Sequence, residues 1–174
     1  MIRKFFCVAM ALLCIIALSS CKKSPENIYL LLTKLSESFG EEYGPSLLYS
    51  DIEKDGFDTV DLKALGRLYS GKWEKPACGS KISGYAIRLP LDDSGFEIHV
   101  LKCVNISDTE EVSELLKKRI ERLQNAEIKE YAPESYERYF VGAEVYILGD
   151  TVFLLATPDN LSVKRMIRQS VKIF

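Results

Sequence analysis

Residues 84–102 read GYAIRLPLDDSGFEIHVLK, and this segment sets the fold class. Apolar side chains alternate with other residues over 85–89 and again over 96–101, which is the period-two pattern of β-strands. Asp-Asp-Ser-Gly at 92–95 is a turn sequence between them. We therefore predict an antiparallel hairpin with one face packed on a core.

Outside this hairpin, the chain carries a second hairpin pattern and several helical patterns. Residues 140–148 and 151–156 are strongly apolar and flank Gly149-Asp150, a hairpin turn pair. Apolar residues at helical spacing predict helices in four segments, namely 28–39, about 58–70, about 107–123 and about 159–172. The predicted order is α-α-β-β-α-β-β-α. This order predicts one α+β domain with an antiparallel sheet of about four strands and helices packed on one face.

The helix that follows the first hairpin has a clear start signal. Ser107-Asp108-Thr109-Glu110 matches a capping box, in which the Ser107 hydroxyl accepts from the Glu110 amide and the Glu110 carboxylate reaches back. Behind it, apolar residues fall on one helical stripe. They are Val112, Leu115, Leu116, Ile120 and Leu123.

Composition bounds the function classes. The chain has 174 residues, with 23 Lys+Arg against 25 Asp+Glu and 47% hydrophobic residues. That balance excludes global disorder, and the length fits a single domain with a short appendage. A net charge of −2 lacks the basic footprint that nucleic-acid binding requires.

The N-terminus has the pattern of a secretion signal. Arg3 and Lys4 precede residues 5–18, which carry no charge. As a helix this stretch would cover about 21 Å, short of the ~30 Å bilayer core. We therefore predict that residues 1–20 are a signal peptide rather than a transmembrane helix.

Leu18-Ser19-Ser20-Cys21 resembles the lipobox of bacterial lipoproteins. The resemblance implies cleavage before Cys21 and acylation of that residue, with chains such as palmitate anchoring the protein on the extracytoplasmic face of the cell membrane. Two or more acyl chains give stable attachment. Residues 21–25 would then be a tether and 26–174 the folded domain. The alternatives are an ordinary signal peptide with an accidental cysteine, or an uncleaved anchor.

Beyond the lipobox, the chain resembles a family of Firmicutes lipoproteins known only as a domain of unknown function. The similarity covers roughly residues 83–157. The motifs that carry it are Val100-Leu101-Lys102, Glu110-Glu111-Val112, Leu115, Leu116, Arg119, Leu123, Tyr131, Ala143-x-Val145 and Gly149-Asp150-x-Val152-Phe153-Leu154. The resemblance implies a membrane-tethered α+β domain and supplies no catalytic residues.

Two cysteines, Cys78 and Cys103, remain in the predicted domain. Outside the cytoplasm they could form a disulfide. Equally, they could be two free thiols that fill space in the core.

Catalytic groups are scarce in the sequence. His99 is the only histidine, which excludes a multi-histidine metal site, and no cofactor or metal motif is present. Glu97, His99 and Cys103 share one strand face and could form a Cys–His pair oriented by a carboxylate. Residues 99 and 103 would lie about 13 Å apart along a strand, so we favour a half-exposed strand face.

Two clusters are candidate interaction surfaces. Tyr131, Tyr136 and Tyr139 crowd one connector and could form an aromatic recognition surface, although we favour a cover over the end of the sheet. Lys164, Arg165 and Arg168 give the last helix a basic face, which could meet anionic lipid or wall polymer or could simply be solvated.

The sequence therefore predicts a lipid-anchored binding or scaffolding module for an envelope partner, without catalytic activity. One alternative is a small-ligand carrier, which requires a dry pocket between sheet and helices. The other is a carboxylate-based hydrolase, which requires a concave pocket with two acidic groups of perturbed pKa.

Overall fold

The computed structural model describes residues 24–25, 27–39, 45–91 and 95–171. The predicted signal peptide, the lipobox with Cys21, and the turn residues 92–94 lie outside the described residues. Among the described residues, no helix combines the length and the apolar character needed to cross a membrane.

The described chain is an α+β domain built on one mixed sheet of six strands, in the order β2-β1-β3-β4-β6-β5. Neighbouring strands are antiparallel except for β1 and β2, which are parallel. The strands are β1 (Ser46–Ser50), β2 (Asp58–Thr59), β3 (Ile82–Pro90), β4 (Glu97–Cys103), β5 (Glu144–Leu148) and β6 (Thr151–Ala156).

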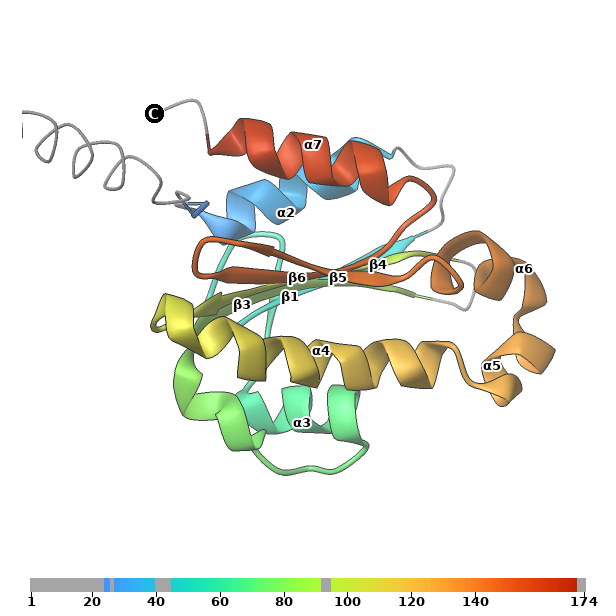
Figure 1. Cartoon of the computed structure of the whole chain (residues 1–174), viewed down its shortest axis with the longest axis horizontal. Coiled ribbons are helices and arrows are strands. Elements are labelled where there is room, and N and C mark those ends of the chain that lie inside the picture. Colours follow the sequence, from blue (N-terminus) through green and yellow to red (C-terminus); the bar gives the residue numbers. More distant parts are fainter. Residues whose placement is uncertain (1–23, 26, 40–44, 92–94, 172–174) are drawn as a thin grey trace, which may run out of the picture.

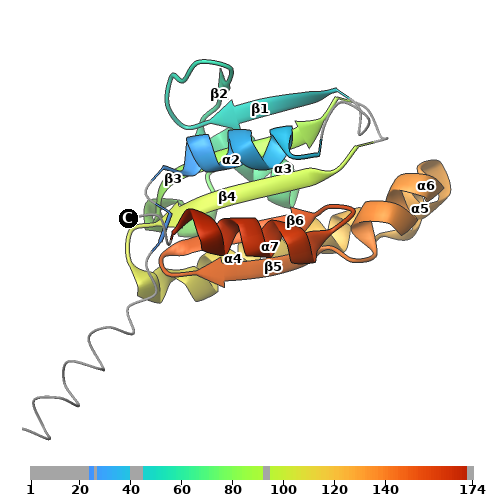
Figure 2. The same ribbon diagram turned by 90° about the horizontal axis from the view of Figure 1, so that it is seen from above.

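Helices cover both faces of the sheet (Figures 1 and 2). On one face lie α2 (Ile28–Glu37) and α7 (Asn160–Ser170), and on the other lie α3 (Leu62–Ser70) and α4 (Thr109–Leu123). The expectation of helices on one face only is therefore wrong. The polar residues of β4 suggested a solvated face, but α3 and α4 bury them.

Both predicted hairpins are confirmed, although β5 begins at Glu144 and not at residue 140. In the first, Ile87 pairs with His99, and in the second, Tyr146 pairs with Phe153. Gly149 turns the second hairpin at φ 61°, a left-handed conformation that favours glycine.

The predicted sheet of about four strands is wrong in number, because β1 comes from a stretch to which no element was assigned, and β2 comes from the start of the helix predicted over about 58–70. Ser-Leu-Leu-Tyr-Ser in β1 has no strict alternation, and β2 has only two residues. Long-range pairing of β1 with β3 makes this segment a strand.

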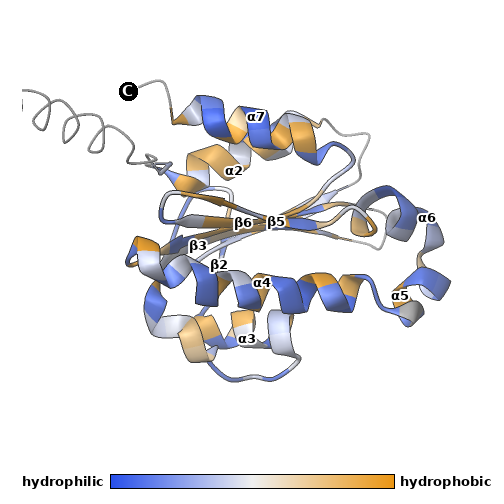
Figure 3. Ribbon diagram, in the orientation of Figure 1, coloured by the Kyte–Doolittle hydropathy of each residue, from blue (hydrophilic) through white to orange (hydrophobic). Residues whose placement is uncertain are grey.

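The start of α3 and the cap of α4 both differ from the sequence prediction, since α3 begins at Leu62 and not at about residue 58. The Asp61 side chain accepts from the amides at 63 and 64, and Gly71 ends α3 at φ 79°. At α4 the predicted Ser107–Glu110 box is wrong. Asn105 and Asp108 form the capping box instead, around the short helix η3 (Ile106–Asp108) that leads into α4. Hydrophobic and hydrophilic segments follow one another along α4, which is the appearance of an amphipathic helix (Figure 3).

Short helices fill the connectors. They are η2 (Ala77–Lys81), before β3, and α5 (Ala126–Tyr131), α6 (Pro133–Ser135) and η4 (Tyr136–Phe140), between α4 and β5. The domain therefore has two distinct ends (Figure 1). The first described residues, the β5–β6 turn and the start of α4 lie at one end, and α5 and α6 lie at the other.

Candidate functional site

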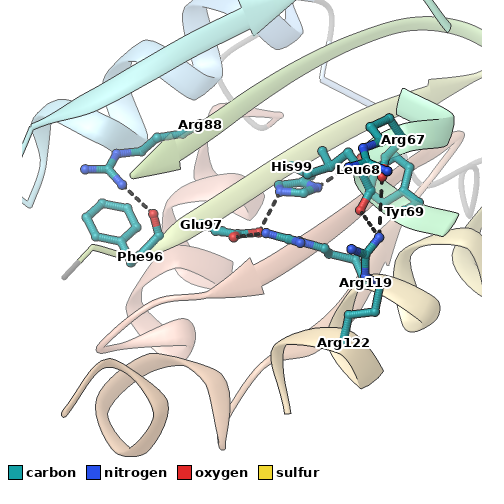
Figure 4. Close-up of polar contacts among 9 residues, drawn as sticks. All are labelled: Arg67, Leu68, Tyr69, Arg88, Phe96, Glu97, His99, Arg119 and Arg122. Atoms are coloured by element: carbon teal, nitrogen blue, oxygen red, sulfur yellow. Dashed lines mark hydrogen bonds and ion pairs between the residues drawn. The ribbon is translucent and has the colours of Figure 1, made fainter. Parts of the chain in front are cut away.

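A chain of four polar side chains lies buried between β4 and the helices α3 and α4 (Figure 4). Glu97 and His99 of β4 are 2% and 0% exposed. The His99 Nε2 atom is 3.1 Å from the Glu97 Oε2 atom, and His99 Nδ1 is 2.9 Å from the Tyr69 hydroxyl. The Arg119 Nε and Nη2 atoms donate to the two oxygens of Glu97, with the first contact at 3.1 Å.

Hydrogen bonds and burial together determine the protonation states of Glu97 and His99. Arg119 and His99 hold the pKa of Glu97 at about 2, against the effect of burial, so the carboxylate is ionised and only accepts. Burial lowers the pKa of His99, so the ring is neutral at pH 7. Nε2 must therefore carry the proton given to Glu97, and Nδ1 accepts from the Tyr69 hydroxyl.

A pocket of about 350 Å³ lies at the Glu97–Arg119 end of this row of buried polar side chains. Glu97 and Arg119 lie on its polar side, together with Arg122 from the same helix. Arg122 donates to the carbonyl of Leu68, which ties α4 to α3. The remaining lining is largely apolar and comes from the end of β3, from α4, and from the α5–η4 region; it includes Leu89, Pro90, Leu91, Leu123, Ile128, Ala132 and Phe140.

The arrangement suits binding better than proton transfer. A carboxyl group with a pKa of about 2 is a poor general acid and a weak base near neutral pH. Nε and Nη2 of Arg119 donate to Glu97, and the same Arg119 side chain lines the pocket. Few polar groups at defined positions within apolar walls are typical of ligand sites.

Glu97 and His99 come together as the sequence allowed, but on a buried face and not on the half-exposed one that we favoured. Cys103 does not join them. Burial raises the pKa of the Cys103 thiol to about 12, which opposes a role as nucleophile. Cys78 is also buried, and burial raises the pKa of its thiol.

Cys78 and Cys103 are both free in the structure, so the disulfide that the sequence left open is not formed there. Cys103 ends β4, where its amide donates to the carbonyl of Asp150, and Cys78 lies in η2. Both side chains contribute to the core as small apolar residues.

Arg88 is a buried cation on the opposite face of the sheet. Its guanidinium lies 3.6 Å from the centre of the Phe96 ring and donates to the Phe96 carbonyl (Figure 4). Burial lowers the pKa of Arg88 to about 10, so it remains charged at neutral pH. Its Nε has no hydrogen-bond partner among the described residues.

A second, more open cavity of about 530 Å³ lies near the end of β1. Asp51 lines it and accepts from the Tyr29 hydroxyl at 2.7 Å and from the Tyr85 amide at 3.1 Å. These bonds join α2, β1 and β3, which is a structural role. Among the described residues, no three His, Cys, Asp or Glu side chains are grouped so as to hold a metal ion.

The tyrosine cluster divides between two environments. Tyr139 is buried, with its ring centre 6.4 Å from that of Phe96, so it covers the end of the sheet. Tyr136 is half-buried and donates to the carbonyl of Gln124. Tyr131 is 76% exposed, in the same helix as the pocket residue Ile128. Only Tyr131 is therefore available as a recognition residue.

Two of the three basic residues of α7 are engaged within the domain. The Lys164 ammonium pairs with Glu144 at 2.8 Å, and Arg168 donates to the Tyr146 hydroxyl at 3.0 Å. Arg165 is exposed. The predicted basic face is thus largely a set of contacts with β5.

Sequence reasoning missed Tyr69 and Arg119 as members of the site. One signal was present, because Arg119 falls three and four residues after Leu116 and Leu115, within the apolar stripe of α4. A cation in a buried stripe indicates a buried partner.

Comparisons with known proteins identify no relative: no family model, no curated protein and no solved structure matches this chain.

Proposed function

We propose that this chain is a lipid-anchored, extracytoplasmic binding protein without catalytic activity, and that the pocket beside Arg119 is its binding site. The anchor rests on the lipobox pattern at Leu18–Cys21. The binding role rests on one observation: Glu97 holds the guanidinium of Arg119 in a fixed orientation at the pocket.

The fixed guanidinium favours recognition because its remaining donors are oriented before a ligand arrives. Glu97 accepts from two nitrogens of Arg119 and from His99, whose other ring nitrogen is bonded to the Tyr69 hydroxyl. Preorganised donors lower the entropy cost of binding. The expected ligand group is a carbonyl or carboxylate oxygen attached to an apolar body that contacts the walls.

A small-ligand carrier is the second candidate function. A pocket of about 350 Å³ is within the usual range for small-molecule sites. Tyr131 on α5 would extend the same site outward for a protein partner. A carboxylate hydrolase has less support, because a general acid requires a raised pKa and that of Glu97 is lowered.

The test is site-specific photocrosslinking in intact cells. Leu91 lies at the pocket and is 60% exposed, and Leu161 on α7 is similarly exposed outside the pocket. A photoreactive side chain at 91 should capture a ligand or partner that the same group at 161 does not. Equal capture at both positions, or none at 91, would overturn the pocket as the binding site.

Cys21→Ala tests the anchor separately. This variant should leave the membrane fraction, because the acylated residue is lost. Retention of Cys21→Ala in the membrane would contradict lipid anchoring at this residue.

A further inference from the structure

We infer that the end of the domain nearest the tether docks on the lipid bilayer, with Val104 and Ile106 entering its interface. The inference rests on the proposed lipid anchor at Cys21. It adds an orientation that an anchor alone does not impose.

Hydrogen bonds connect the tether to the segment that joins β4 to α4. The amide of Asp150, in the β5–β6 turn, donates to the Ser24 hydroxyl at 2.8 Å. The carbonyl of Asp150 accepts from the Cys103 amide, also at 2.8 Å. Val104 follows directly, and its amide donates to the Lys81 carbonyl at 2.9 Å. Ser24 is therefore held at the end of the domain that carries residues 104–106.

The separation between the proposed lipid and this end is short. Three residue steps join Cys21 to Ser24, since 24 − 21 = 3. Even fully extended, they span at most about 11 Å. A domain held this closely to acylated Cys21 has its tether end at the headgroups.

That end exposes two large apolar side chains that the core does not use. Val104 and Ile106 are 55% and 64% exposed, and they lie two residues apart in the connection between β4 and α4. A single exposed aliphatic residue is ordinary on a protein surface, but an exposed pair beside a lipid anchor matches an interface-inserting segment. Figure 1 places this connection at the end where the described chain begins.

Charges near this segment are mostly neutralised within the protein. Lys81 pairs with Glu111 and lies 3.9 Å from Asp108, whose carboxylate also caps Asn105. Glu110 is exposed in the first turn of α4. Lys22 and Lys23 in the tether add two cations beside the proposed anchor. Zwitterionic vesicles are therefore the appropriate probe, because they separate apolar insertion from attraction to anionic lipid.

The experiment uses the full chain, lipidated in a bacterial host and reconstituted into phosphatidylcholine vesicles with or without brominated acyl chains. Trp73 is the only tryptophan, so Trp73→Phe provides a silent background. Ile106→Trp then places a reporter at the proposed interface. Leu161→Trp is the matched control, because Leu161 is 57% exposed and lies at the start of α7, beyond the opposite end of β6. Unfolding midpoints of the two variants check that both are folded.

Brominated lipid should quench Ile106→Trp emission by about twofold or more and leave Leu161→Trp unchanged, since interfacial side chains reach the acyl boundary. If both variants float with vesicles but neither is quenched, or both are quenched equally, the docking inference is wrong while the anchor stands. If neither variant floats with vesicles, the proposed anchor itself fails, and the docking inference fails with it.

Discussion

The two faces of the sheet bury charge in different ways. Under α3 and α4, the anion Glu97 is matched by the cation Arg119 and backed by His99. Under α2 and α7, Arg88 is held by the Phe96 ring and carbonyl. The first face neutralises charge with charge, and the second offsets the burial of a cation with an aromatic ring and a backbone oxygen.

This difference between the two faces predicts which substitutions of buried charged residues reduce the unfolding free energy most. Removing one member of an ion pair leaves the other buried and uncompensated. Removing Arg88 leaves no opposite charge behind, only apolar surface and a backbone carbonyl that has lost one donor. Four substitutions or conditions test whether the two faces differ in this way.

The largest effect is expected for Glu97→Gln. The Arg119 side chain is 17% exposed, so losing its counter-charge should cost about 3–5 kcal/mol of unfolding free energy. Chemical denaturation measures this loss. Glu114→Gln is the control, because Glu114 pairs with Lys117 on an exposed helix face and its loss should move the midpoint little. Equal midpoints for the two variants would show that breaking the buried Glu97–Arg119 pair costs no more than breaking an exposed one.

Acid should destabilise the domain through the same face. The pKa of Glu97 is about 2 in the folded chain against 4.5 normally, so the unfolded state binds its proton first. The contribution of Glu97 to stability is therefore full above about pH 4.5 and falls by about 3 kcal/mol as the pH approaches 2. Burial lowers the pKa of His99 from 6.5. Protonation of this histidine in the unfolded state therefore begins to reduce the unfolding free energy already below about pH 6.5.

Unfolding free energies measured across this pH range test the assignment. In Glu97→Gln the loss between about pH 4.5 and 2 should shrink relative to the parent chain, whereas the loss that begins below pH 6.5 through His99 should persist. An unchanged acid profile would show that Glu97 does not control this transition.

Tyr69→Phe should have an intermediate effect. It leaves His99 Nδ1 without a donor in a fully buried site, which should cost about 1–3 kcal/mol. Thermal or chemical unfolding measures the change, with the exposed Tyr131→Phe as a control that should be neutral. A neutral Tyr69→Phe would indicate that the hydroxyl is dispensable to the chain of bonds.

The smallest effect is expected for Arg88→Met. Methionine keeps apolar volume near Phe96 but loses the ring contact at 3.6 Å and the hydrogen bond to the Phe96 carbonyl, so the cost should be about 1–2 kcal/mol. Arg119→Met, which strands the Glu97 carboxylate, is the matched comparison and should cost several-fold more. Similar costs at 88 and 119 would show that the faces bury charge alike.

Local patterns predicted the two hairpins and the principal helices. The alternation over 85–89 and 96–101, and the Gly149-Asp150 turn, were sufficient because these contacts are close in sequence. The β1 strand could not be predicted in this way. Its residues become a strand by pairing with β3, about 40 positions later, and their own spacing favours no element.

Only part of the candidate site could be predicted from the sequence, for the same reason. Glu97 and His99 share a strand and could be associated by alternation. Tyr69 and Arg119 lie 30 and 22 positions away from the atoms they contact. Only the packing of α3 and α4 against β4 brings them in, and that packing turned a supposed solvent face into a buried one.

The position of the pocket relative to the tether gives the sheet a further role, as a spacer. β4 runs from Cys103, beside the tether end, to Glu97 at the pocket, a span of about 20 Å at ~3.3 Å per residue. For a chain anchored at Cys21, strand length would then fix how far above the bilayer a ligand is met. Because the domain docks through Val104 and Ile106, lengthening the tether would leave both that height and the pocket chemistry unchanged.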